Sequence, residues 1–349
     1  MLIASFWAFT PIWRLSGGVF LNNLQFFDRP NAVASAPSYK EKDVMIILDG
    51  GMSRELQRVG APFRQPEWSA LALIETPSLV EQVHREYAAA GADVITTNSY
   101  ALVPFHIGET RFQAEGLALA ARAGELARRA ANDVNQAQPG RHVRVAGSLP
   151  PVFGSYRPDL FDAARAQDYL SVLVTGLSPF VDIWLGETLS AIDEAKAALE
   201  ALPNDGRPVW ISFTLEDSEA ARGQTPVLRS GESVADAATW AIAAGIETLL
   251  FNCSQPEVME PAIRTAAAAF AAANADITIG VYANAFESHD DEKANETLAD
   301  IRQDLDGTRY GDWAAQWQAA GAAVIGGCCG IGVRHINALS RRFTAEAVG

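Results

Sequence analysis

The stretch AVIGGCCG (323–330) joins a short apolar run to a glycine-rich turn that carries two adjacent cysteines. The apolar run predicts a β-strand, the last of eight such runs in the chain. Neighbouring side chains point to opposite faces of a regular strand, so Cys328 and Cys329 can face one point only where the backbone leaves strand geometry. Glycines permit that departure. The pair is therefore either part of a metal site or a chance pair in a turn.

Apolar runs of this kind alternate with helical stretches from Val44 onward. The expected strands are 44–48, 93–97, 142–147, 181–186, 208–214, 247–252, 277–282 and 323–325. The expected helices are 53–59, 77–90, 112–135, 191–202, 234–244, 257–273, 311–320 and 333–345. The helix over 77–90 has the clearest boundaries, with Thr76 as its N-cap, Pro77 in its first turn and Gly91 at its end.

Eight strands that are buried on both faces and connected by helices predict an α/β fold, a (β/α)8 TIM barrel. An open, doubly wound sheet is the competing architecture. The count of eight and the missing glycine-rich dinucleotide fingerprint favour the barrel. The barrel is expected to be a single domain over 44–349. Residues 1–43 are apolar and aromatic but lack the basic start of a signal peptide, so they are expected to be a weakly ordered extension or the product of an over-extended start site.

The composition limits the class of protein. A chain of 349 residues with 49% hydrophobic residues can build a large core. Its net charge of -15 argues against nucleic acid and anionic membrane as partners. Three cysteines, two of them adjacent, do not form a disulfide framework and fit a reducing compartment, so a cytoplasmic location is expected. Small molecules are the expected partners, and nothing indicates an obligatory protein partner.

The chemistry of a barrel collects at the carboxyl ends of its strands. All three cysteines fall there, because Cys253 follows the sixth expected strand and Cys328 and Cys329 follow the eighth. This placement favours a metal site with three thiolate ligands and an open fourth position, as in catalytic zinc sites. Thiolate ligands select a soft or borderline metal, and zinc is the expected ion. The five histidines lack ligand spacing and are expected to be structural or exposed.

Two acidic residues also lie at strand ends. Asp49 and Glu187 are candidates to bind the ammonium group of an amino-acid substrate, although a helix cap and a surface contact would explain them too. The amides of Gly50 and Gly51 precede an expected helix and are candidates to bind a carboxylate. Asn252 is expected to bind substrate, to steady the metal loop or to cap the strand.

These residues belong to longer segments that resemble the homocysteine S-methyltransferases. The matching segments are LDGGMSREL (48–56), EWSALALIETPSLV (67–80), AGADVITTNSY (90–100), GETL (186–189), SFTLEDS (212–218), FNCS (251–254) and QWQAAGAAVIGGCCG (316–330). Two segments at the expected mouth depart from the family pattern, namely GSLPP (147–151) and the pair Ala283-Asn284. They leave the methyl donor open.

The resemblance implies a zinc-dependent enzyme that methylates homocysteine to methionine. It implies about one zinc ion per chain, bound by Cys253, Cys328 and Cys329. It also implies that Asp49 and Glu187 hold the homocysteine amino group. The branch that it most resembles uses S-methylmethionine or S-adenosylmethionine as donor.

Two alternatives stay open. One is the same chemistry on another small thiol or a selenol such as selenohomocysteine. The other is a barrel that binds zinc or thiols without catalysis.

Overall fold

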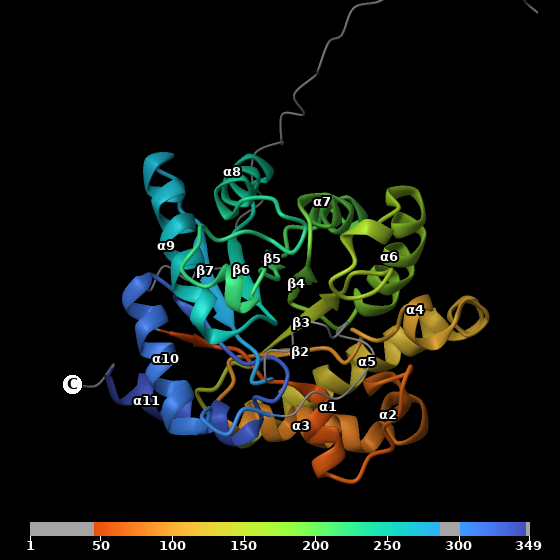
Figure 1. Cartoon of the computed structure of the whole chain (residues 1–349). Coiled ribbons are helices and arrows are strands. Elements are labelled where there is room, and N and C mark those ends of the chain that lie inside the picture. The colour runs from red at the N-terminus through yellow and green to blue at the C-terminus, as the bar shows by residue number, and fades with distance from the viewer. Residues whose placement is uncertain (1–44, 287–300, 347–349) are drawn as a thin grey trace, which may run out of the picture. The chain divides into compact units, whose positions relative to one another are not determined.

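The computed structural model describes residues 45–286 and 301–346, and these form a closed barrel of strands surrounded by helices (Figure 1). The eight strands are β1 (Ile46–Ile47), β2 (Val94–Thr96), β3 (Arg144–Leu149), β4 (Ile183–Leu189), β5 (Val209–Phe213), β6 (Thr248–Asn252), β7 (Thr278–Tyr282) and β8 (Val324–Ile325). The predicted extension 1–43 lies outside the described residues.

Every neighbouring pair of strands is parallel, in the order β1-β8-β7-β6-β5-β4-β3-β2. The two strands at the ends of this order, β1 and β2, are joined by a parallel bridge between Leu48 and Val94. The Asp49 amide also donates to the Val94 carbonyl over 3.0 Å. These contacts close the sheet. The predicted (β/α)8 barrel is therefore confirmed, and the open sheet is excluded.

The helices occupy most of the connections between strands. They are α1 (Met52–Arg58), α2 (Ser69–Glu75), α3 (Pro77–Ala90), α4 (Pro104–Ile107), α5 (Glu109–Ala137), α6 (Ala163–Leu177), α7 (Ile192–Ala201), α8 (Val234–Ala244), α9 (Pro256–Ala272), α10 (Gly307–Ala320) and α11 (Val333–Glu346). Helices α2, α4 and α6 are absent from the sequence prediction. Thr76 occupies the predicted N-cap position of α3, but its hydroxyl donates backward to the Ala72 carbonyl and makes no capping hydrogen bond.

The barrel has two apolar regions, one inside the strands and one between strands and helices. The inner cluster contains Leu48, Val94, Ala146, Ile183, Leu185, Trp210, Leu250, Tyr282 and Val324. Tyr282 places its hydroxyl at the carboxyl end of the strands, where polar groups begin. The packed interior thus forms the floor of the mouth in which the chemistry is expected.

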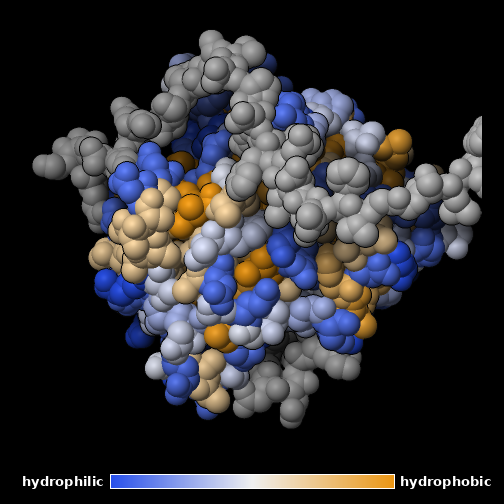
Figure 2. All heavy atoms as spheres, turned by 90° about the horizontal axis from the view of Figure 1, so that it is seen from above, coloured by the Kyte–Doolittle hydropathy of each residue, from blue (hydrophilic) through white to orange (hydrophobic). Residues whose placement is uncertain are grey.

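The face seen in Figure 2 mixes hydrophilic and hydrophobic residues in small groups. Among the described residues, the exposed large hydrophobic side chains are Phe105, Leu117, Leu160 and Ile301. No helix in the described part of the chain is long and apolar enough to cross a membrane.

Candidate active site

Three cysteine thiols meet at the carboxyl ends of β6 and β8. Cys253 follows β6 directly, and Cys328 and Cys329 lie three and four residues after the end of β8. Their sulfur atoms all lie within 4.8 Å of one another, and the Cys253 and Cys329 sulfurs are 3.9 Å apart. All three are free thiols. The structure therefore brings together the cysteines that the sequence predicted at one mouth.

This spacing fits a metal ion. Ligand sulfurs about 2.3 Å from a tetrahedral zinc are separated from each other by about 3.8 Å. The observed 3.9 Å matches that edge. The donor set suits a soft or borderline metal, and it leaves one tetrahedral position for a further ligand.

The backbone around the cysteines takes the form that convergence requires. Cys253 has φ 51°, in the left-handed region, and Gly330 has φ 81° just after the cysteine pair. Gly51 packs so closely that an added Cβ would lie 2.5 Å from the Cys328 carbonyl oxygen. The Cys328 amide donates to the Ala283 carbonyl over 2.9 Å, which ties the turn to the end of β7.

The protons in the cluster are shared unequally. The Cys328 and Cys329 thiols donate to the Cys253 sulfur and hold the pKa of Cys253 well below its usual range. These hydrogen bonds to Cys253, followed by burial and the charge of Cys253, raise the pKa values of Cys328 and Cys329. A metal cation bound among the three sulfurs would favour the thiolate form of all three, because metal ligands must be deprotonated.

The two acids predicted from the strand ends are buried in the same mouth. The Asp49 carboxylate accepts from the Thr96 amide (2.7 Å) and the Thr96 hydroxyl (3.0 Å). The Glu187 carboxylate accepts from the hydroxyls of Ser148 and Tyr282. Burial raises the pKa of Asp49 to about 8, with a further contribution from the charge of Glu187. Burial also raises the pKa of Glu187 to about 7.

These partners are neutral, so they do not compensate the two carboxylate charges. A cation that enters between Asp49 and Glu187 would lower both pKa values and leave both groups ionised. The alternative roles are not seen, since Glu187 is 8% exposed and Asp49 receives its hydrogen bonds from β2.

Two predicted site residues have their polar atoms in use. The Gly51 amide donates to the Ile331 carbonyl over 2.9 Å, so this N–H holds the cysteine turn and is not available for a carboxylate. The Asn252 amide oxygen accepts from the Thr188 amide (3.0 Å) and the Ser212 hydroxyl (2.7 Å), and its nitrogen donates to the Thr188 hydroxyl (2.8 Å). These contacts tie the end of β6 to Thr188 in β4 and Ser212 in β5, a role that was not among those predicted for Asn252.

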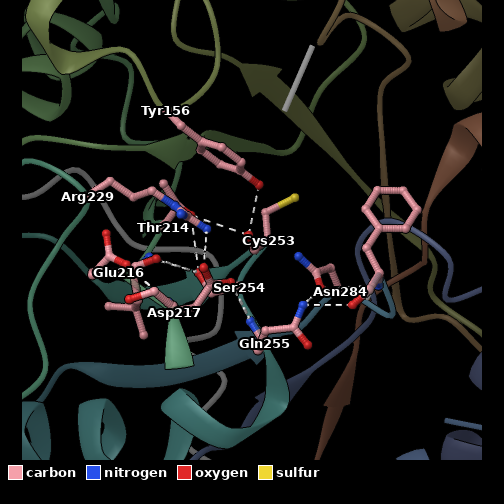
Figure 3. A network of polar contacts seen from close by, with 12 residues as sticks. Tyr156, Thr214, Glu216, Asp217, Arg229, Cys253, Ser254, Gln255 and Asn284 are labelled. Carbon is pink, nitrogen blue, oxygen red and sulfur yellow. Dashed lines mark hydrogen bonds and ion pairs between the residues drawn. The ribbon is translucent and has the colours of Figure 1, made fainter. Parts of the chain in front are cut away.

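A polar network beside Cys253 was not predicted. Tyr156, Asp217 and Arg229 surround the loop after β6 (Figure 3). They come from the segments that follow β3 and β5, where no periodic pattern fixes the backbone. The signals in the sequence were their placement after strand ends and, for Asp217, its position in the family-like segment SFTLEDS (212–218).

None of the histidines in the described part of the chain joins the cysteine cluster. His84 is fully buried on α3, and His106 on α4 contacts the Pro66 carbonyl through Nδ1 over 3.0 Å. The Nε2 of His335 lies 2.9 Å from the Leu305 carbonyl. His289 lies outside the described residues. In the described part of the chain, the group of metal-binding side chains is the three cysteines.

Comparison with known proteins places the chain among the methyltransferases. It is 31% identical over 318 residues to homocysteine S-methyltransferase of Escherichia coli, covering 86% of this chain and 96% of that protein. It is 31% identical over 319 residues to homocysteine S-methyltransferase 1 of Arabidopsis thaliana, covering 84% and 92%. Selenocysteine methyltransferase of Astragalus bisulcatus is 28% identical over 311 residues, covering 81% and 88%.

A solved structure agrees with these relatives. The metallated form of the homocysteine methyltransferase from Escherichia coli superposes with a TM-score of 0.68 at 29% identity, covering 86% of this chain and 97% of that one. The family model for homocysteine S-methyltransferase matches residues 46–343. The chain belongs to the homocysteine S-methyltransferase family and is an enzyme of the methyltransferase class.

Proposed function

We propose that the protein is a zinc-dependent S-methyltransferase that transfers a methyl group from a sulfonium donor to homocysteine, giving methionine. The observation that carries the proposal is the meeting of three thiols, within 4.8 Å of one another, with two buried acids in one mouth. Thiols suit a metal that binds sulfur, and acids suit the ammonium of an amino acid. Homocysteine has both groups.

Cys253, Cys328 and Cys329 would hold the zinc ion. Zinc bound in this way would lower the pKa of a thiol at its fourth position, so that homocysteine would be present as thiolate near neutral pH. The close packing of Gly51 against the Cys328 carbonyl keeps the turn in the conformation that presents both sulfurs.

Asp49 and Glu187 would bind the homocysteine ammonium group. Each carboxyl group is fixed by hydrogen bonds, so the two groups are oriented before the substrate arrives. Both acids ionise as the ammonium enters, because a nearby cation reverses the cost of burying the charge. Of the two glycine amides, we assign the substrate carboxylate to Gly50, since the Gly51 amide is used by Ile331.

The chain's contribution to the transfer is then one of positioning. The thiolate sulfur attacks the donor methyl group, a new carbon–sulfur bond forms, and the methyl–sulfonium bond breaks. The electron pair of that bond stays on the donor sulfur and neutralises its positive charge. Holding the two sulfurs in line on either side of the methyl group accounts for the acceleration.

The acceptor has a second candidate. Selenocysteine methyltransferase of Astragalus bisulcatus is among the relatives, and a selenol would fit a site built for a thiolate. Homocysteine is the first choice because the other relatives described above carry its name. We place the protein in the cytoplasm, since three free thiols need a reducing environment.

A donor panel tests the proposal. With homocysteine as acceptor, S-methylmethionine or S-adenosylmethionine should release methionine, whereas betaine should not. Methionine is quantified by mass spectrometry after incubation with the full-length, zinc-loaded protein. Selenocysteine in competition with homocysteine separates the two acceptors. Absence of methyl transfer with every donor, from protein that holds zinc, would favour the barrel without catalysis.

A further inference from the structure

Cys253 has a backbone conformation that its side chain does not favour. Its φ of 51° is uncommon for a residue other than glycine, asparagine or aspartate. Such a conformation persists where the surroundings determine it. The residue is 7% exposed, so its surroundings are protein groups on most sides.

Two hydroxyl groups hold the Cys253 carbonyl. The Tyr156 hydroxyl donates to it over 2.9 Å, and the Thr214 hydroxyl approaches it at 3.4 Å. In Figure 3 both hydroxyls lie near the Cys253 carbonyl oxygen, while the sulfur lies at the end of the side chain, away from that oxygen. Fixing the carbonyl therefore restricts the direction of the Cα–Cβ bond that carries the sulfur.

Arg229 contacts both of those hydroxyl residues. Its guanidinium carbon lies 4.1 Å from the centroid of the Tyr156 ring, in cation–π geometry, and its Nε donates to the Thr214 hydroxyl over 3.4 Å. Tyr156 follows β3 and Arg229 lies between β5 and α8, so one side chain joins two loops that are distant in sequence.

The charge of Arg229 is paired on the far side of the same loop. Its Nη2 donates to Asp217 Oδ1 over 2.7 Å, and Asp217 Oδ2 accepts from the Gln255 amide over 2.9 Å. The side chains of Arg229 and Asp217 are 18% and 12% exposed. The Cys253 carbonyl is thus held by Tyr156 and Thr214, and the amide of Gln255, two residues further along the loop, is held by Asp217.

We propose that Arg229 is a positioning residue for the metal centre. It keeps Tyr156 and Thr214 against the Cys253 carbonyl, so that the Cys253 sulfur faces Cys328 and Cys329. The inference rests on the proposed function, because it assumes that the three thiols bind a metal. Arginine suits the role because its planar guanidinium stacks on a ring while its edge donates hydrogen bonds, and lysine cannot do both.

The test measures metal binding and counts thiolates. Cd²⁺ is titrated into the full-length, metal-free, reduced protein, and its ultraviolet charge-transfer absorption reports the thiolates bound to each ion. Arg229→Lys keeps the charge, and Tyr156→Phe removes the hydroxyl. Each should weaken Cd²⁺ binding about 10-fold and lower the absorption per ion toward that of two thiolates. The double variant should lose no more than the more affected single variant, because both act through the same carbonyl.

Arg128→Lys is the matched control. Arg128 also pairs with an aspartate, Asp182, over 2.6 Å, and that pair lies at the start of β4, at the opposite end of the barrel. This variant should bind Cd²⁺ as the wild type does. Thermal unfolding, followed by circular dichroism, checks that all variants fold.

Three results would overturn the inference. Folded Arg229→Lys and Tyr156→Phe proteins with wild-type affinity and absorption would show that Cys253 needs no such support. An equal loss in Arg128→Lys would reduce the effect to general destabilisation. A wild-type protein that binds no Cd²⁺ would contradict the metal site itself, and thus the proposed function, which the first two results leave intact.

Discussion

Burial sets the protonation behaviour of Asp49 and Glu187. Both carboxylates lie among neutral partners, and burial raises their pKa values to about 8 and about 7. At neutral pH Asp49 is therefore mostly protonated in the empty site and Glu187 is about half ionised. Under the proposed function, an arriving ammonium group would lower both pKa values and ionise both groups.

The raised pKa of Asp49 predicts a cost in stability that grows with pH. Its ordinary value is 3.8, so between about pH 4 and pH 8 the folded state binds a proton that the unfolded chain has lost. Stability is lost as pH rises through that window. Asp49→Asn should remove this loss, so relative to wild type the variant gains up to about 4 kcal/mol between pH 5 and pH 8. Urea unfolding of metal-free, reduced, substrate-free protein measures it.

Asp168→Asn on the exposed face of α6 serves as the control and should follow the wild type across the same range. A stability difference between Asp49→Asn and wild type that stays constant with pH would show that Asp49 is ionised in the empty site.

The sequence predicted which residues lie at the mouth better than it predicted their hydrogen-bond partners. Cys253, Cys328, Cys329, Asp49 and Glu187 were found because strand ends share one mouth, a rule that needs only the strand assignments. The hydrogen bonds that occupy the Gly51 amide and the Asn252 side chain were not predicted. They depend on which carbonyl or hydroxyl lies opposite, and no local pattern encodes that partner.

Among the elements, α3 carries a buried group unrelated to the site. His84 is 0% exposed, and within the described residues neither ring nitrogen has a hydrogen-bond partner. Burial lowers its pKa to about 3. The helix thus holds a neutral imidazole inside the barrel's outer core.

This histidine predicts acid sensitivity. The unfolded chain takes up a proton on His84 near the ordinary value of 6.5, and the folded chain does so only near 3. Stability should therefore fall as pH drops below about 6.5, by up to about 2 kcal/mol at pH 5. His84→Leu should remove that part of the pH dependence, measured by urea unfolding at pH 7.5 and pH 5. His142→Leu, at an exposed position, should leave the pH dependence of stability unchanged. An unchanged pH dependence in His84→Leu would show that the imidazole is protonated in the folded state.

Prediction of the elements succeeded where local signals were strong. Helix α3 spans 77–90 as predicted, since Pro77 and Gly91 limit it even though Thr76 provides no cap. Helix α6 was missed although its signals are present, with Asp162 accepting from the Ala164 and Arg165 amides and buried residues at helical spacing. The loops that carry Tyr156, Asp217 and Arg229 have no such signals, because tertiary contacts set their conformation.

Only the closed barrel brings the carboxyl ends of β6 and β8 to the same mouth, with β7 between them. Cys253 is 75 residues from Cys328 in the sequence, yet closure of the barrel brings their sulfurs within 4.8 Å. The barrel itself was predictable from the count and spacing of the strands. The methyl donor was not, because the mouth loops depart from the family pattern at 147–151 and at Ala283-Asn284.

The most direct test of the account measures zinc and methyl transfer together. Purified full-length protein should hold about one zinc ion per chain by atomic emission and should form methionine from homocysteine and S-methylmethionine or S-adenosylmethionine. Cys328→Ser should lose both the zinc and at least about 100-fold in activity, while its circular dichroism spectrum stays that of a folded barrel. Full methyl transfer by a zinc-free preparation, or by Cys328→Ser, would contradict the account.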